Sequence, residues 1–70
     1  MKEVVFRADR LRELREREGK SVQVLSELLG FGQNTIRKYE AGERVPTLKN
    51  LCTIAQYFDV SVEYFLNISD

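Results

Sequence analysis

The stretch Ser21–Glu40, SVQVLSELLGFGQNTIRKYE, decides the fold of this chain. Its first half repeats apolar residues at spacings of three and four, which predicts a helix with one buried stripe: Val22, Leu25, Leu28 and Leu29. A second helical register follows, in which only Ile36 and Tyr39 are large and of a buried type. The connector, Gly30-Phe31-Gly32, is too short for an antiparallel pair, but its glycines permit a sharp corner. The stretch therefore predicts two short helices at a steep angle.

The second of these helices has an outer face suited to the major groove of DNA. That face consists of hydrogen-bond donors and cations without a carboxylate: Gln33, Asn34, Arg37 and Lys38. Side-chain amides and guanidinium groups bond base edges, and positive charge meets phosphate. We interpret the stretch as a helix-turn-helix in which these four residues read bases. The alternative is an ordinary solvated helix face.

Several further motifs lie in the order and spacing of a known family. They are Arg10–Arg15 with Gly19; Leu25, Gly30, Thr35, Ile36, Tyr39, Glu40 and Gly42; and Pro46, Leu48, Leu51, Ala55, Val60, Ser61 and Tyr64–Leu66. In these residues the chain resembles the Cro-like phage repressor (XRE) family of helix-turn-helix domains. The resemblance implies an all-α fold, a compact five-helix repressor-type domain, and sequence-specific binding of double-stranded DNA as a transcriptional regulator, expected to be a repressor.

Three positions depart from the family pattern. Val22 stands where the family usually has a glutamine that bonds a phosphate, and the adjacent Gln23 points about 100° away on a helix. Gly32 stands where a side-chain cap is usual, at a cost of a few tenths of a kcal/mol. Ser26 replaces a small alanine, and we expect its hydroxyl to bond back to the preceding turn.

Apolar periodicity and capping residues predict five helices, over about 8–18, 21–29, 33–41, 48–58 and 62–67. The expected N-caps are Ser21, Thr47 and Ser61, and Val60 is expected to staple to Phe65. In the fourth helix the expected buried stripe is Leu48, Leu51, Ile54, Ala55 and Phe58.

The expected organisation is a single domain with short ends. Residues 1–7 form an N-terminal arm, residues 8–67 the DNA-binding domain and residues 68–70 a tail. Within the arm, Val4–Phe6 can be a short strand or a disordered segment that packs Phe6 on Leu11, and the sequence leaves both open.

Charge is unevenly distributed although the formal net charge is zero. Residues 32–50 carry four cations against two anions, whereas residues 51–70 carry three anions and no cation. In the first helix, Glu13 with Arg17 and Arg12 with Glu16 have the spacing of self-paired surface charges. We therefore expect the reading side to be positive, and non-specific binding to be weak and sensitive to salt.

The resemblance and the charge pattern suggest roles for the remaining polar residues. The candidates for contacts with the DNA backbone are Thr35, Arg44, Lys49 and Gln23. For Arg44 and Lys49 the alternative is an ordinary solvated charge. We interpret Tyr39 as a core residue, and we expect Glu40 to brace an arginine of the first helix, with Arg10 as the candidate.

A single domain of this kind buries only about 600–1,000 Å² on DNA, so a homodimer on a palindromic operator is expected. The candidate dimer interface is the cation-free end of the chain: Tyr57, Tyr64, Phe65, Leu66 and Ile68. This is more apolar material than the short helix expected over 62–67 can hide. The alternative is that Phe65 and Leu66 complete the monomer core, which leaves Tyr64 and Ile68 as the interface.

Composition argues against several other classes of protein. With no histidine and one cysteine, Cys52, the chain has neither a zinc-ligand set nor a nucleophile–base pair. We expect no enzyme activity, no metal and no small-molecule cofactor. A single unpaired cysteine fits the cytoplasm, and without a long apolar run we expect neither a membrane partner nor a signal peptide.

A second function stays open on the sequence alone. The domain can instead be a protein-binding adaptor, such as an antitoxin or an inhibitor of another regulator. Val22, the neutral charge and the acidic end favour this alternative, whereas the carboxylate-free face of the 33–41 helix disfavours it.

Overall fold

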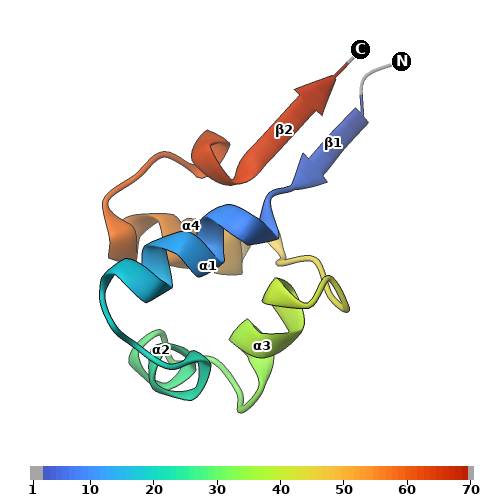
Figure 1. The fold of residues 1–70 in the computed structure, drawn as a ribbon. Coiled ribbons are helices and arrows are strands. Elements are labelled where there is room, and N and C mark those ends of the chain that lie inside the picture. The colour runs from blue at the N-terminus through green and yellow to red at the C-terminus, as the bar shows by residue number, and fades with distance from the viewer. Residues whose placement is uncertain (1–2, 70) are drawn as a thin grey trace.

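A computed structural model describes residues 3–69. These residues form four α-helices, one 3₁₀ turn and a two-stranded antiparallel sheet (Figure 1). The helices are α1 (Ala8–Arg17), α2 (Val22–Leu28), α3 (Thr35–Glu40) and α4 (Leu48–Phe58). The expectation of an all-α, five-helix domain was therefore wrong, although the helical core of a helix-turn-helix domain is present.

The C-terminal region accounts for the difference. The expected fifth helix, 62–67, is a single 3₁₀ turn, η1 (Val62–Phe65), which leads directly into strand β2 (Leu66–Ser69). Within the described residues the Ser61 side chain makes no capping bond, although its carbonyl accepts from the Tyr64 N–H at 3.1 Å. Without a side-chain cap and with a β-branched residue at its start, so short a helix is not favoured over an extended strand.

Strand β2 pairs with the N-terminal strand β1 (Glu3–Phe6), which settles the alternative left open for the arm. The register joins Phe6 to Leu66 and Val4 to Ile68. The backbone bond from the Arg7 N–H to the Phe65 oxygen, 2.6 Å long, continues the pairing into the helical body. Figure 1 shows the two strands extending beyond the helices, at the end of the molecule away from α2 and α3. Met1 lies outside the described residues, as does Lys2.

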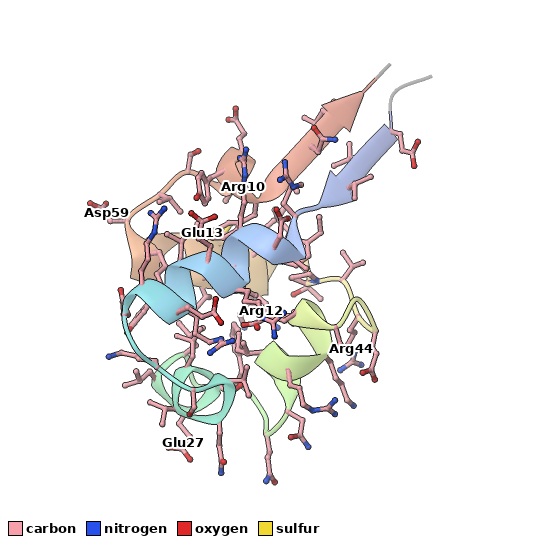
Figure 2. All side chains as sticks on the ribbon, viewed as in Figure 1. Arg10, Arg12, Glu13, Glu27, Arg44 and Asp59 are labelled. Carbon is pink, nitrogen blue, oxygen red and sulfur yellow. The ribbon has the colours of Figure 1, made fainter. Side chains whose placement is uncertain are left out.

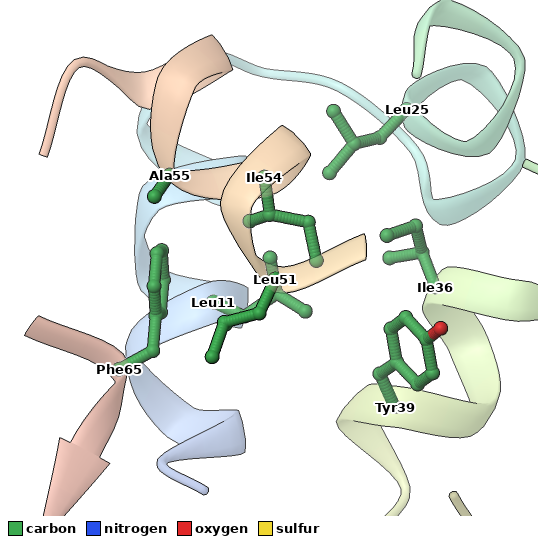
Figure 3. Packing of buried hydrophobic residues seen from close by; sticks show 8 residues of the cluster. All are labelled: Leu11, Leu25, Ile36, Tyr39, Leu51, Ile54, Ala55 and Phe65. Atoms are coloured by element: carbon green, nitrogen blue, oxygen red, sulfur yellow. The ribbon is translucent and has the colours of Figure 1, made fainter. Parts of the chain in front are cut away.

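The core lies between the helices and is closed by the 3₁₀ turn. Its buried members are Leu11, Leu25, Ile36, Tyr39, Leu51, Ile54, Ala55 and Phe65 (Figure 3). Each helix contributes to the core, so displacing any one of them would expose apolar surface. The cost in free energy is about 25 cal/mol per Å² exposed. Phe6 packs on this cluster. The centroid of its ring is 6.4 Å from that of Tyr39 and also 6.4 Å from that of Phe65.

Most helix ends follow local chemistry. Ser21 caps α2 by accepting from the Val24 N–H, and Thr47 caps α4 by accepting from the Asn50 N–H, as predicted. Gly19 ends α1 with a positive φ of 67°. In α4, however, Leu48 is 73% exposed and does not join the buried stripe, which was a wrong prediction.

Candidate nucleic-acid interface

The turn between α2 and α3 is built from backbone hydrogen bonds. The Phe31 N–H donates to the Ser26 backbone oxygen at 2.9 Å, and the Gly30 N–H donates to the Glu27 backbone oxygen at 3.1 Å. These two bonds form a Schellman motif, which requires the left-handed φ of 72° found at Gly30. The motif sets the corner between the two helices.

Helix α3, the helix expected over residues 33–41, begins later than the sequence predicted. The Thr35 N–H donates to the Gly32 oxygen at 3.2 Å, and Asn34 has φ 71° and ψ 2°. These values are those of the third position of a type II turn. Gln33 and Asn34 thus form a turn in front of α3 rather than its first helical turn, so the expected helix of 33–41 was wrong at this end. Both side chains are exposed.

Ser26 supplies a cap for α3 from the neighbouring helix. Its Oγ accepts from the Ile36 N–H at 3.2 Å, and the serine is only 1% exposed. The expected bond to its own helix is not the one it makes. The N-cap residue of α3, Asn34, makes no side-chain capping bond, so the bond from Ser26 satisfies an amide that would otherwise be buried and unpaired. It also fixes the distance between α2 and α3.

The polar residues expected to face DNA come from three segments. Gln23 of α2 and Gln33 of the turn line one pocket, together with Ser26, Glu27 and Phe31. Arg37 is half exposed on α3, with its Nη1 3.5 Å from Glu43 Oε2. Lys38 and Thr35 are partly buried.

The loop after α3 carries the next cation. The Glu43 N–H donates to the Lys38 oxygen at 3.0 Å beside Gly42, whose φ is 76°, in a second Schellman motif. Arg44 follows and is exposed beside α3 (Figure 2). Lys49 is exposed in the first turn of α4. Asn50 Nδ2 donates to the Tyr39 hydroxyl at 3.0 Å and so joins α4 to the recognition helix.

An ion pair holds α3 against α1. Arg15 Nε and Nη2 donate to the two oxygens of Glu40 at 2.6 and 2.8 Å, and both side chains are nearly buried. The hydrogen bond to Glu40 raises the pKa of Arg15, so the guanidinium stays charged. Glu40 does brace the first helix, but the partner is Arg15. The expected partner, Arg10, donates instead to the Tyr64 backbone oxygen at 2.7 Å.

Sequence reasoning could have found Arg15. It lies four residues after Leu11, so the helical period places it on the inward face of α1. Arg10 precedes Leu11 by one residue and lies on another face, as Figure 2 shows by its position opposite Arg12.

The candidate interface residues at the other end are divided by burial. Phe65 is fully buried and belongs to the monomer core, which is the alternative considered for it. Tyr64 and Leu66 are partly buried, and Ile68 is 54% exposed. Tyr57 is partly buried on α4, where its hydroxyl donates to Glu18 Oε1 at 3.0 Å.

The described residues were also compared with what a membrane span or a metal site requires. In residues 3–69 no helix has the length and apolar character needed to cross a membrane. The same part of the chain shows no group of three or more metal-ligating side chains. The single cysteine, Cys52, is partly buried in α4.

Comparison with known proteins places the chain in the same class of protein that the α2–α3 turn and its two helices indicate, the helix-turn-helix proteins. Residues 11–65 match the family model described as helix-turn-helix. The chain belongs to this family of DNA-binding transcription regulators, of the XRE type.

Several relatives carry matching names. The chain is 40% identical over 58 residues to the HTH-type transcriptional regulator AnsR of Bacillus subtilis, covering 83% of this chain and 50% of that protein. It is 36% identical over 61 residues to the uncharacterized HTH-type transcriptional regulator YobD of the same organism, covering 87% and 54%. It is also 31% identical over 55 residues to the cryptic phage CTXphi transcriptional repressor RstR of Vibrio cholerae, covering 79% and 49%. The chain thus spans about half the length of these relatives.

Proposed function

We propose that this chain binds double-stranded DNA sequence-specifically and represses transcription, acting as a homodimer on a palindromic operator. The observation that carries the proposal is the surface formed by the α2–α3 turn and α3. From Gln33 to Lys38 every exposed polar side chain is an amide or a cation. Such a surface matches base edges flanked by phosphates.

The late start of α3 changes the proposed roles within this surface. Gln33 and Asn34 precede the helix, so they meet the DNA from the turn, and Thr35 is the first helical residue. Either amide side chain can bond an adenine edge in a bidentate manner, worth about 1–3 kcal/mol against the wrong base. Arg37 and Lys38 lie one helical turn later, within reach of guanine or of a flanking phosphate. Arg44 is proposed as a backbone contact.

Dimerisation is proposed to use the outer end of the ribbon formed by β1 and β2. Side chains alternate along strands, so the pairs Phe6–Leu66 and Val4–Ile68 lie on one face. The first pair packs on the core, whereas Val4 is 58% and Ile68 54% exposed. An apolar face that begins in the core and continues uncovered is typical of an interface. Ile68, Tyr64 and Leu66 are the proposed interface residues, and Phe65 drops out because it is buried.

The relatives support repression only by analogy, because one of them is named as a phage transcriptional repressor. The adaptor function is the second candidate. Val22, which is partly buried against the core in place of a phosphate-bonding glutamine, is the observation that favours it.

Selection from a pool of random duplexes tests the proposal. The purified chain should enrich a palindrome, and footprinting of that sequence should show two protected half-sites about 10 base pairs apart, centre to centre. A pool with no enriched sequence after repeated rounds would contradict sequence-specific binding and would favour the adaptor.

A further inference from the structure

A pocket between α1, α2 and α3 gathers three arginines. Its lining consists of Arg12, Arg15, Val22, Arg37, Glu40 and Ala41. Two of the arginines come from α1 and one from the recognition helix. Val22 and Ala41 supply the apolar part of the wall.

The three guanidinium groups are not equivalent. Arg15 uses its donors on both oxygens of Glu40 and on the Lys20 backbone oxygen at 2.8 Å. Glu40, the carboxylate that lines the pocket, is thereby occupied and is only 7% exposed. The Arg15–Glu40 pair therefore has no net charge, and its polar groups are already hydrogen-bonded to each other within the pocket wall.

Arg12 and Arg37 keep donors to spare. Arg12 Nε is 3.8 Å from Glu40 and 3.9 Å from Glu16, both longer than a hydrogen bond, and its side chain is 64% exposed. Arg37 Nη1 has a weak contact of 3.5 Å with Glu43. A guanidinium carries five N–H donors, so each group can bind a further acceptor.

The nearby acidic groups do not close the site. Glu16 and Glu43 are exposed and lie outside the residues that line the pocket. Exposed ion pairs contribute little to stability, so replacing such a carboxylate by a phosphate costs little. Arginine forks match phosphate geometry and bind it with two parallel bonds.

The position of the pocket decides which phosphate it meets. Arg37 belongs both to the pocket and to α3, so the pocket opens at the flank of the reading surface. The major groove is about 12 Å wide, so a helix in it has a phosphate backbone along each flank. Figure 2 shows Arg12 on the side of α1 that faces α3.

We infer that Arg12 and Arg37 together bind one backbone phosphate of duplex DNA, with the Arg15–Glu40 pair beneath them holding α1 and α3 at the right separation. This inference rests on the proposed DNA binding. It assigns a DNA contact to the first helix, outside the turn and the recognition helix.

Binding of a labelled random-sequence duplex, measured by fluorescence anisotropy between about 50 and 200 mM salt, tests the site. Arg12→Gln should weaken binding about tenfold and reduce the slope of log affinity against log salt by about 1, as loss of one phosphate contact does. Arg12→Lys keeps the charge and should keep most of the slope. Glu16→Gln removes the negative charge 3.9 Å from Arg12 Nε that competes with a phosphate for this guanidinium, so it should strengthen binding, a gain that misfolding cannot produce.

The matched control is Arg17→Gln. Arg17 lies on the same helix, is 65% exposed and, like Arg12, has an i,i+4 carboxylate partner, here Glu13, but it does not line the pocket. Equal losses of slope in Arg12→Gln and Arg17→Gln would overturn the inference while leaving DNA binding intact. A wild type that does not bind duplex DNA would overturn both the inference and the proposed function.

Discussion

Ser26 of α2 caps α3 by accepting a hydrogen bond from the Ile36 N–H at 3.2 Å, inside the core. The geometry of the helix-turn-helix therefore depends on a side chain from its first helix. Because the N-cap residue Asn34 makes no side-chain capping bond, the bond from Ser26 takes the place of a local cap at the start of α3.

Ser26→Ala should lower the free energy of unfolding by about 1–3 kcal/mol, because it leaves a buried amide unpaired. Urea unfolding followed by circular dichroism measures the change. Ser21→Ala is the control, since it removes an exposed cap of the same type and should cost about 1 kcal/mol. A loss at Ser26 below about 0.5 kcal/mol would show that the bond is not needed.

Glu40→Gln should be strongly destabilising. It leaves Arg15 charged and nearly buried without its partner, which costs about 3–5 kcal/mol. Glu43→Gln removes an exposed partner of Arg37 and should cost less than about 1 kcal/mol. Thermal unfolding of both variants measures the difference, and similar melting temperatures would contradict a structural role for the Arg15–Glu40 pair.

The stabilisation that Arg15 contributes through its pair with Glu40 should not change with pH near neutrality. The pKa of Arg15 is raised by Glu40, so its contribution is complete below the ordinary arginine pKa and is lost only as the pH rises through the raised value. Near neutrality the guanidinium remains charged.

Asn34 should tolerate glycine but not alanine. Its φ of 71° costs a residue with a Cβ about 1–2 kcal/mol, less for asparagine, whereas glycine adopts it freely. Asn34→Gly should therefore unfold at the wild-type temperature or above, and Asn34→Ala below it. If alanine were tolerated as well as glycine, the type II turn would be wrong. The glycine variant is also the better probe of DNA contacts, because it removes the side chain and keeps the backbone.

The helix-turn-helix could be predicted because its signals are local. Apolar spacing, the caps Ser21 and Thr47, and Gly30 each act within a few residues of where they stand. The ribbon could not be predicted in the same way, because it joins residues near opposite ends of the chain and each strand has only four residues. The late start of α3 was missed for a different reason, which is local. Asn34 adopts a left-handed conformation that the periodicity of Ile36 and Tyr39 does not reveal.

Ile68→Glu should weaken self-association if the ribbon face is the dimer interface. The wild type should melt at a temperature that rises with protein concentration from about 1 to 100 μM, because association stabilises the folded chain by mass action. The variant should melt lower and independently of concentration. Asn67→Glu is the control, since it adds the same charge on the opposite face of β2. Equal effects of the two variants, or a wild type without concentration dependence, would contradict this interface.

Base reading by the turn in front of α3 is tested by comparing the affinity of turn and loop variants for the selected operator and for random duplex DNA. Gln33→Ala combined with Asn34→Gly should cost about 2–6 kcal/mol on the selected operator and little on random duplex, because two base contacts are lost. Arg44→Ala should instead weaken both duplexes alike and flatten the salt dependence, as loss of a phosphate contact does. If the Gln33/Asn34 variant bound operator and random DNA with equal losses of affinity, the turn in front of α3 would not read bases, and sequence-specific recognition through this turn would be contradicted.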